Sequence, residues 1–498
     1  MLDVSRSDLV AGVAGAGTMG RGIAQVLAQG GARTLLFDAQ PDAAQKARAS
    51  IAQALGKLVE KGKTSDAQAK AILARIEVAP ALEALAPCHV VVEAIIEDLG
   101  AKRELFSKLE GIVGADCILA SNTSSLSVTA MAAACKRPGR VAGYHFFNPV
   151  PVLKIVEVVD GVRTEPWTTD ALTALAQRFG HAAVRCKDTP GFIVNHAGRA
   201  FVPEALRVLS EGVADFAAID RILVDTAGFR IGPFGLMDLV GLDVNHAVMK
   251  SMYQQYFEEP KYRPSFLVEP RVAAGLLGRK TGRGWYEYGK DGIAQPIPEQ
   301  KIPSVKPGSA WAVPELKELF AKLSFPLQKS SGKETINFIA PLGDDATTAA
   351  LKLGLDPRRT VAVDPLFGFA KRRTLMTTPV TRPEIRDAAH ALLAAGGVPV
   401  SVIGDSPGFV AQRVVAHIVN VGCDIMQMRI CSPADLDRAV MLGLSYPRGP
   451  LGFGDALGAQ RILTVLENMH DFLQEPRYRP SPWLRRRAQL GVSLLTPE

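Results

Sequence analysis

The sequence contains few cysteines and no motif that would join them. Its six cysteines are scattered along 498 residues without CxxC or any other metal-ligand spacing. Thiols in this arrangement are typical of reduced, buried side chains, so we expect a cytoplasmic protein with no metal site. The six are Cys88, Cys117, Cys135, Cys186, Cys423 and Cys431.

Long apolar runs and a strong charge imbalance are also missing. No stretch approaches the roughly 18 apolar residues of a membrane span, and residues 1–8 carry acids rather than a secretory apolar core. The net charge of +7 is small for this length. No module interleaves basic residues with aromatics, so we expect neither a membrane nor a nucleic-acid partner. The charge surplus would suit a small substrate carrying phosphates.

A glycine-rich turn follows the first apolar run. Residues 9–14 predict a buried strand, and Gly15-Ala-Gly17-Thr-Met-Gly20 leads from it into a segment with helical spacing. Gly15 permits the turn, Gly17 lets the backbone approach a pyrophosphate, and Gly20 lets the helix pack on the strand. A second predicted strand ends in Asp38, where an acid binds ribose hydroxyls and repels a 2′-phosphate. This context predicts NAD binding.

Two later predicted strands also end in polar residues. The apolar run 90–96 ends at Glu97, and the run 118–120 is followed by Ser121-Asn-Thr-Ser-Ser125. Ligands of a doubly wound sheet bind beyond the carboxyl ends of its strands, so Glu97 is placed to meet the cofactor. The hydroxyls of residues 121–125 can cap the next helix or donate to a substrate carbonyl. Both interpretations stay open on this pattern.

One histidine lies in an apolar and aromatic stretch. His145 stands between Tyr144 and Phe146, and Glu157 follows twelve residues later. Imidazole is the natural general base for an alcohol proton near neutral pH, and a carboxylate on its other nitrogen fixes the tautomer. Alone, such a histidine is more often part of a core. The dinucleotide motif upstream favours the general base.

The helical part of the chain repeats itself. Beyond residue 186 the apolar residues follow helical spacing, and Lys187–Asn195 returns as Gly404–Gln412, 217 residues later. Three further pairs have an offset of 216 or 217: Ala218–Arg221 with Asp435–Arg438, Gly232–Asp238 with Gly449–Asp455, and Glu259–Ser265 with Glu475–Ser481. A constant offset predicts a tandem duplication of a helical domain.

The second half lacks the residues that could carry chemistry. Asp364 stands near the position of His145, no glutamate follows it as Glu157 does, and Gln412 replaces Asn195. We therefore predict an α/β Rossmann-type domain, followed by all-α domains with a degenerate α/β remnant between them. The predicted ranges are an NAD-binding domain (1–186), a helical substrate or dimerisation domain (187–297), a linker (298–334), the degenerate remnant (335–403) and a second helical domain (404–498).

These residues together resemble the 3-hydroxyacyl-CoA dehydrogenase family in its long form with two C-terminal helical modules. The resemblance rests on the glycine turn, Ser121–Ser125, His145-Phe-Phe-Asn-Pro149 and Asp188-Thr-Pro-Gly-Phe192. It covers residues 8–290 and, more weakly, 400–485. The layout is similar to bacterial enzymes of phenylacetate degradation that oxidise 3-hydroxyadipyl-CoA, and to 3-hydroxybutyryl-CoA dehydrogenases. It implies NAD-dependent oxidation of an (S)-3-hydroxyacyl-CoA to the 3-oxoacyl-CoA.

The resemblance also implies residue roles. His145 corresponds to the general base, Glu157 to its orienting partner, and Ser124 with Asn195 to groups that hold the substrate's oxygens. Lys61 corresponds to a lysine that touches CoA, whereas Ala54 replaces a family serine, which leaves the mode of CoA binding open. Beside the glycine turn, the residues that correspond to cofactor contacts are Asp38, Glu97, Lys102, Ser124, Asn148 and Lys280.

Two other functions compete with this interpretation. One is a non-catalytic homologue like the related lens crystallin, and the other is a dehydrogenase of free hydroxy acids, which would not need Lys61. The resemblance further suggests that the second helical domain acts as a partner surface, because helical modules of shorter relatives pair between subunits. We expect either a pseudo-dimer within one chain or a homo-oligomer.

Overall fold

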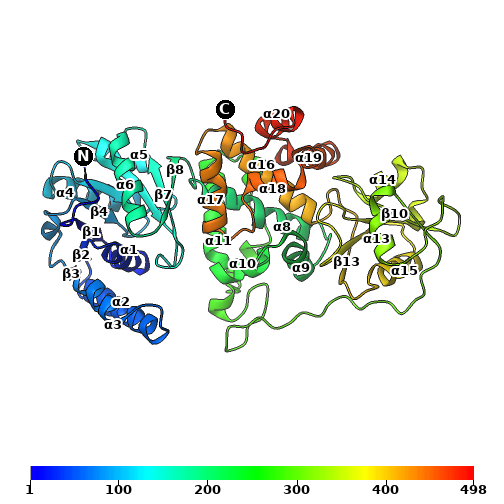
Figure 1. Ribbon diagram of the computed structural model, residues 1–498, viewed down its shortest axis with the longest axis horizontal. Coiled ribbons are helices and arrows are strands. Elements are labelled where there is room, and N and C mark those ends of the chain that lie inside the picture. Colours follow the sequence, from blue (N-terminus) through cyan, green and yellow to red (C-terminus); the bar gives the residue numbers. More distant parts are fainter. Residues whose placement is uncertain (1) are drawn as a thin grey trace. The chain divides into compact units, whose positions relative to one another are not determined.

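The computed structural model describes residues 2–498, and the chain divides into two compact units. The first unit comprises residues 1–196 together with 429–444, and the second comprises 197–428 together with 445–498. Each unit is built around its own sheet or helical core (Figure 1).

The first unit contains an eight-stranded sheet in the order β3-β2-β1-β4-β5-β6-β7-β8. Neighbouring strands are parallel except for the antiparallel pair β6 and β7. The order of the first six strands is the doubly wound arrangement, which brings ligands to the carboxyl ends of the strands. The strands are β1 (Val10–Ala14), β2 (Arg33–Phe37), β3 (Ile76–Val78), β4 (Val90–Glu93), β5 (Ile118–Ser121), β6 (Val141–Phe146), β7 (Ile155–Asp160) and β8 (Ala182–Lys187).

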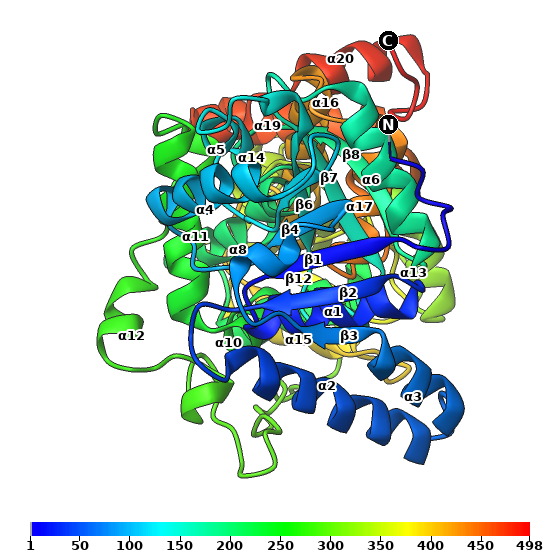
Figure 2. The same ribbon diagram turned by 90° about the vertical axis from the view of Figure 1, so that its left-hand side faces the viewer.

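The helices of this unit cover a sheet whose central strands are buried on both faces. Every residue of β4, β5 and β6 is buried, which is typical of parallel strands covered by helices on both faces. Helices α2 and α3 form a pair beside β3 (Figure 2). The helices are α1 (Thr18–Gln29), α2 (Ala43–Glu60), α3 (Asp66–Ala74), α4 (Leu99–Ile112), α5 (Val128–Ala132), α6 (Pro166–Arg178) and α7 (Val194–Ala197). The predicted Rossmann-type fold is confirmed.

A segment from late in the chain completes this unit. Residues 429–444 carry α17 (Pro433–Gly443), which packs against β7 and β8. The Lys187 N–H donates to the Ile430 carbonyl over 2.9 Å, and Cys186 faces Cys431 in an antiparallel bridge. A segment of the predicted second helical domain therefore belongs, by its packing, to the unit that contains the glycine turn.

The helices of the second unit surround α16. Of its residues, all but Asp424 and Gln427 are buried, and it packs against α8, α9, α18, α19 and α20. The helices that precede the second sheet in sequence are α8 (Phe201–Ser210), α9 (Phe216–Ala227), α10 (Pro233–Val240), α11 (Leu242–Gln255) and α12 (Glu269–Ala273). Those that follow it are α16 (Ala411–Gln427), α18 (Pro450–Leu457), α19 (Ala459–Leu473) and α20 (Pro482–Leu490).

A buried ion cluster holds the helices of this unit together. The fully buried Glu204 carboxylate forms ion pairs with two arginines. Its Oε1 lies 2.6 Å from Arg413 Nε, and its Oε2 lies 3.1 Å from Arg477 Nη1. Burial alone would raise the pKa of Glu204, but the two guanidinium groups outweigh it and hold the pKa far below its usual range. Buried charges need such partners, because an unpaired one is strongly destabilising.

A second, smaller sheet lies in the second unit. Its order is β13-β12-β11-β10-β9, and only β11 and β12 run antiparallel. Taken from β9 to β13, these strands repeat the order and the relative directions of β4 to β8 in the first sheet. The elements are β9 (Ala310–Ala312), β10 (Ile336–Ile339), β11 (Thr360–Val363), β12 (Arg373–Thr377), β13 (Val400–Ile403), α13 (Lys317–Lys322), α14 (Ala346–Lys352) and α15 (Pro383–Leu393).

Matching contacts support the correspondence between the two sheets. Asp188 accepts hydrogen bonds from the N–H groups of Val128 and Thr129, at the start of α5. Asp405, 217 residues later, accepts from the N–H groups of Ala346 and Thr347, at the start of α14.

Regular structure begins earlier than the predicted end of the linker. Strand β9 and helix α13 both lie inside the range 298–334. Strand β9 pairs in parallel with β10, so it is the edge strand of the second sheet. Its three residues stand among proline, glycine and lysine, and so short an edge strand leaves no periodic pattern.

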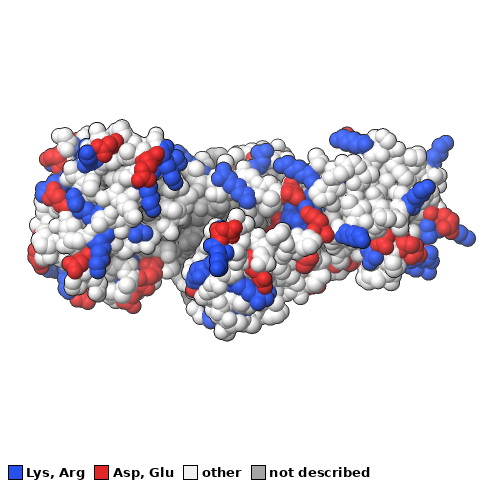
Figure 3. Space-filling view, turned by 90° about the horizontal axis from the view of Figure 1, so that it is seen from below, with Lys and Arg blue, Asp and Glu red and all other residues white. Residues whose placement is uncertain are grey.

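Acidic and basic side chains are interspersed on the face of the molecule shown in Figure 3. Among residues 2–498, no helix has both the length and the apolar composition needed to cross a bilayer.

Candidate active site

The glycine turn of the first unit tolerates no side chain at two of its positions. Gly15 has φ of +106°, and a Cβ atom there would lie 2.4 Å from the Ala94 carbonyl oxygen. A Cβ at Gly20 would lie 1.8 Å from the carbonyl oxygen of Gly15. Around Gly17, by contrast, no atom lies within 4 Å of the Cβ position. The backbone at the start of α1 is therefore open to a phosphate, and the residues fit the dinucleotide that the motif predicts.

Asp38 touches this turn directly. One carboxylate oxygen accepts a hydrogen bond from the Ala16 N–H over 2.6 Å, and the other accepts from the Gln40 N–H over 2.8 Å. The acid at the end of β2 therefore holds the glycine turn in place, in addition to its predicted role toward a ribose.

A buried ion pair that the sequence analysis missed lies at the end of β4. Glu93 Oε1 lies 2.5 Å from Lys102 Nζ, and the two side chains are 0% and 1% exposed. The other oxygen of Glu93 accepts the Ser121 hydroxyl over 2.6 Å. Lys102, a predicted cofactor contact, is thus held inside the protein. Its Nζ also lies 3.3 Å from Glu97 Oε2.

Glu97 gathers the hydroxyls that follow β5. Its Oε1 accepts from the Thr123 hydroxyl over 2.7 Å, from the Ser124 N–H over 2.9 Å and from the Ser125 hydroxyl over 3.0 Å. Burial would raise the pKa of Glu97, but these donors and Lys102 outweigh it and lower the pKa. Glu97 and Ser124, which were predicted separately from the ends of two strands, are therefore hydrogen-bonded neighbours.

His145 and Glu157 form a hydrogen-bonded pair across β6 and β7. They are direct cross-strand neighbours, and His145 Nδ1 lies 2.5 Å from Glu157 Oε2. The other carboxylate oxygen accepts the N–H groups of Ile193 and Val194 over 2.9 and 2.8 Å. Glu157 is fully buried, so these two N–H groups fix it in one orientation. The pair leaves Nε2 of His145 for another partner.

Asn195 and Ser124 lie together in the same unit. The Asn195 side-chain amide donates to the Ser124 carbonyl over 3.4 Å. The neighbouring Asn122 accepts the Phe146 N–H over 2.9 Å, which joins the segment after β5 to the strand of His145. The four predicted catalytic residues thus come from connected elements of one unit.

A cavity of about 430 Å³ lies beside the glycine helix. Asn148, at the exposed turn after β6, contributes to its wall. Ala54 also lines it, with Lys57 and Ser50 on the same face of α2 and Arg21 on α1. Positions 50, 54 and 57 have the spacing of one helix face, and this spacing is the only feature of the sequence that groups them. Lys61 is exposed beyond the end of α2 and is absent from the lining of this cavity.

Lys280 belongs to the second unit. Its Nζ lies 2.6 Å from both carboxylate oxygens of Asp243. The glycine-rich loop that carries it is fixed by Asp238, which accepts the N–H groups of Trp285 and Tyr286 over 2.8 Å each.

The composition of this site agrees with comparisons to known proteins. Residues 10–189 match the NAD-binding domain of 3-hydroxyacyl-CoA dehydrogenase, and both 191–288 and 408–493 match its C-terminal domain. A 3-hydroxyadipyl-CoA dehydrogenase of Escherichia coli K12 is 38% identical over 481 residues, which is 96% of this chain and 97% of that protein. The chain belongs to the 3-hydroxyacyl-CoA dehydrogenase family.

Some relatives match nearly the whole of this chain, and others are shorter and match about half of it. The crystal structure of a 3-hydroxybutyryl-CoA dehydrogenase from Escherichia coli K12 superposes with a TM-score of 0.87 at 35% identity, covering 97% of this chain and 99% of that one. A probable 3-hydroxybutyryl-CoA dehydrogenase of Deinococcus radiodurans is 43% identical over 277 residues, which is 56% of this chain and 99% of that protein. The first unit of this chain therefore contains the family's NAD-binding domain.

Proposed function

We propose that this protein oxidises (S)-3-hydroxyacyl-CoA to 3-oxoacyl-CoA with NAD. The observation that carries the proposal is the 2.5 Å contact between His145 Nδ1 and Glu157 Oε2, in the unit that carries the glycine turn. A buried carboxylate on one nitrogen of a histidine is the arrangement that prepares the other nitrogen to act as a base.

In this mechanism Nε2 of His145 takes the proton of the substrate's 3-hydroxyl. The dinucleotide, which the glycine turn and Asp38 would hold, would supply the acceptor for the hydride that leaves C3. Glu157 stabilises the imidazolium that forms, and its two backbone donors keep it from turning away. Ser124 and Asn195 hold the 3-oxygen and the thioester. The protein's contribution is positioning and charge, because the redox chemistry belongs to the cofactor.

For the cofactor, we propose that the glycine turn receives the pyrophosphate and Asp38 the adenosine ribose. Glu97, Ser124 and Asn148 remain proposed contacts near the nicotinamide end. Lys102 acts through Glu97 in this scheme, because its own ammonium is buried against Glu93. Lys280 keeps its proposed cofactor role from the resemblance.

For CoA, we propose that the cavity beside α1 and α2 receives part of the substrate. Arg21, Ser50 and Lys57 line it together with Ala54, so they offer polar donors that substitute for the missing serine. Lys61 follows Lys57 by one helical turn and extends the positive edge toward the CoA phosphates.

The acyl group is proposed to be 3-hydroxyadipyl or 3-hydroxybutyryl, the two substrates in the names of the long relatives. Steady-state kinetics with both CoA esters decides between them, because the better substrate has the higher kcat/KM. The scattered free cysteines support a cytoplasmic location.

For the second half, we propose a tandem duplication that supplies a partner surface within the chain. The 217-residue offset between Asp188 and Asp405, with their matching helix contacts, supports it. Asp364 directly follows β11, and it lies opposite Thr374 of the antiparallel neighbour β12. In the first sheet His145 lies opposite Glu157 in the same way, so Asp364 corresponds to His145 and Thr374 to Glu157. A pseudo-dimer within one chain follows, and a homo-oligomer of such chains is compatible with it.

The direct test follows NADH absorbance with (S)-3-hydroxybutyryl-CoA and, as the matched control, with free (S)-3-hydroxybutyrate. The proposal requires NADH formation with the CoA ester and little with the free acid. No turnover with any 3-hydroxyacyl-CoA would favour a non-catalytic homologue. Equal turnover with the free acid would favour a hydroxy acid dehydrogenase.

A further inference from the structure

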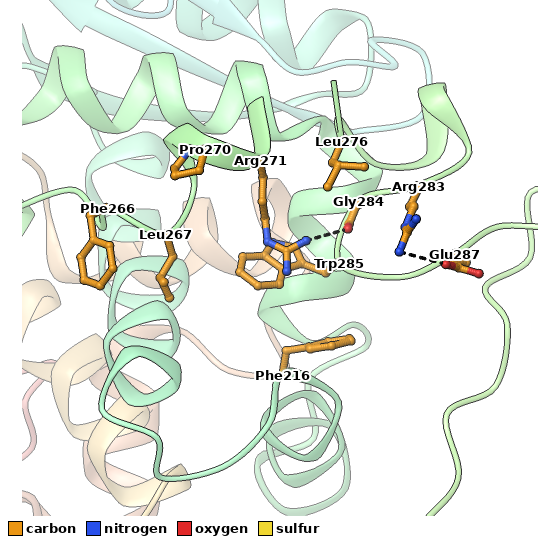
Figure 4. A pocket seen from close by; sticks show the side chains of 10 residues that line it. All are labelled: Phe216, Phe266, Leu267, Pro270, Arg271, Leu276, Arg283, Gly284, Trp285 and Glu287. Carbon is orange, nitrogen blue, oxygen red and sulfur yellow. Dashed lines mark hydrogen bonds and ion pairs between the residues drawn. The ribbon is translucent and has the colours of Figure 1, made fainter. Parts of the chain in front are cut away.

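A second cavity, of about 600 Å³, lies in the second unit between α12 and the loop 283–287. Figure 4 shows Phe266 and Leu267 on one side of Arg271, and Arg283 with Glu287 on the other. Phe216 and Trp285 add aromatic surface. Apolar walls with a few polar groups, at this volume, are the usual character of a small-molecule site.

Arg271 is the cation that this cavity leaves for a ligand. Its guanidinium lies 3.8 Å from the centre of the Trp285 ring and donates to the Gly284 carbonyl over 3.0 Å. Arg283 is already paired with Glu287 over 3.2 Å, and the nearby Asp238 carboxylate is taken by backbone N–H groups. Burial lowers the pKa of Arg271, and the nearby Asp238 carboxylate offsets only part of this effect. A bound anionic ligand would balance the positive charge of the Arg271 guanidinium.

The second helical segment shows what fits beside this arginine. With the offset of 216 between Glu259–Ser265 and Glu475–Ser481, Arg271 corresponds to Arg487 and Leu267 to Trp483. The Arg487 guanidinium lies 3.2 Å from the centre of the Trp483 ring and donates to the Thr496 carbonyl. Trp483 is 3% exposed. In the second segment the indole on the arginine comes from position 483. In the first segment it is Trp285 that packs on Arg271, and Leu267 lines the open cavity instead.

We propose that this cavity binds a small planar anion, such as an aromatic carboxylate or sulfonate, with its ring among Phe216, Phe266 and Trp285 and its charge on Arg271. The ligand lies beside Leu267, the residue that corresponds in sequence to Trp483 of the second segment. The cavity wall at Gly284 and Trp285 continues the loop that carries Lys280, so the ligand contacts a loop with a proposed cofactor residue.

The probe is 8-anilinonaphthalene-1-sulfonate, titrated into the full-length protein and followed by its fluorescence. N-phenyl-1-naphthylamine, which has the same rings without the sulfonate, is the matched neutral probe. We expect saturable binding of the sulfonate and clearly weaker binding of the neutral amine. Equal affinities for the two probes would overturn the proposal, because they would show that Arg271 adds nothing.

Two variants locate the site. Leu267→Trp places an indole inside the cavity and should abolish the saturable binding. Arg271→Gln should weaken it by about tenfold or more, the usual effect of losing a charge-assisted hydrogen bond. Arg485→Gln, at an exposed arginine paired with Glu467 on the second segment, is the control and should change nothing. Circular dichroism checks that each variant is folded.

If Leu267→Trp does not fold, Arg271→Gln decides alone. Unchanged affinity in a folded Arg271→Gln variant, or the same loss in Arg485→Gln, would place the probe elsewhere and overturn the proposal.

Discussion

A Cβ atom at Gly443 would stand 3.0 Å from both methyl carbons of Val194, so the end of α17 lies directly against the turn that holds Glu157. The Val194 N–H donates to Glu157 over 2.8 Å, and Glu157 in turn holds His145. By sequence α17 belongs to the second helical segment, yet it packs in the first unit. The second half of the chain is thereby in contact with the residues that orient the proposed base.

The first prediction concerns this contact. Gly443→Val should push Val194 away and weaken its bond to Glu157, which lowers kcat about tenfold while KM for NAD changes little. Overpacking of this kind costs about 1–3 kcal/mol of stability. Gly111→Val is the control, because Gly111 is also helical and has no atom within 4 Å of its Cβ position. Equal kcat in the two variants would contradict the contact's role.

The second prediction concerns the whole second half. A fragment of residues 1–297 lacks α17, so the surface of β7 and β8 that α17 covers is left open. We expect the fragment to associate or to lose most of its activity, measured by light scattering and NADH formation. A soluble, monomeric and fully active fragment would refute the idea of a partner surface supplied in cis.

The third prediction concerns the buried ion pair below Glu97. Glu93→Gln removes the nearer of the two carboxylates beside the buried Lys102 ammonium and leaves Glu97 at 3.3 Å, so we expect a loss of about 3 kcal/mol in the free energy of unfolding, the lower end of the cost of breaking a buried pair. Urea denaturation measures this. The control is Glu104→Gln, because Glu104 and Lys108 form an exposed pair whose loss should barely change stability. Similar losses in both variants would contradict the larger contribution expected of the buried pair.

The fourth prediction concerns pH. Burial raises the pKa of Asp364 to about 6, above the ordinary 3.8. The folded protein therefore keeps a proton that the unfolded chain releases, and stability falls as the pH rises from about 4 to about 6. Asp364→Asn keeps an oxygen to accept from Leu366 and Gln412 but cannot ionise. It should stabilise the protein by about 2–3 kcal/mol above pH 7 and hardly at all near pH 4.

Urea unfolding of the unaltered protein and of Asp364→Asn, near pH 4 and above pH 7, tests this pH dependence. A gain that is the same at both pH values would mean that ionisation of Asp364 is not its cause.

The local motifs predicted much of the site. The glycine turn and Asp38 follow from strand ends, because parallel strands deliver their carboxyl ends to one edge. The pairing of His145 with Glu157 follows from the need of a histidine base for a carboxylate on its other nitrogen. The pattern could not reveal Glu93, since a single acid at the end of an apolar strand indicates nothing about its partner. The resemblance alone gives Lys102 its predicted cofactor contact, and it carries no sign that the ammonium pairs with Glu93.

Long-range packing lay outside the reach of the sequence. The repeat places α17 with the second helical segment, but its apolar face packs on β7 and β8 of the first unit. Periodicity shows that a helix has an apolar face and not which surface covers it. The cavity residues Ser50 and Lys57 were missed for the same reason, because their spacing identifies a face of α2 without showing that it borders a cavity.

The most direct test of the proposed mechanism is the rate of NADH formation from (S)-3-hydroxybutyryl-CoA or 3-hydroxyadipyl-CoA by His145→Gln, with NAD affinity measured in parallel. Loss of a general base typically costs about 10²–10⁴-fold, so we predict a fall in kcat of at least that size with nearly unchanged NAD binding. Turnover equal to that of the unaltered protein would contradict the role of His145.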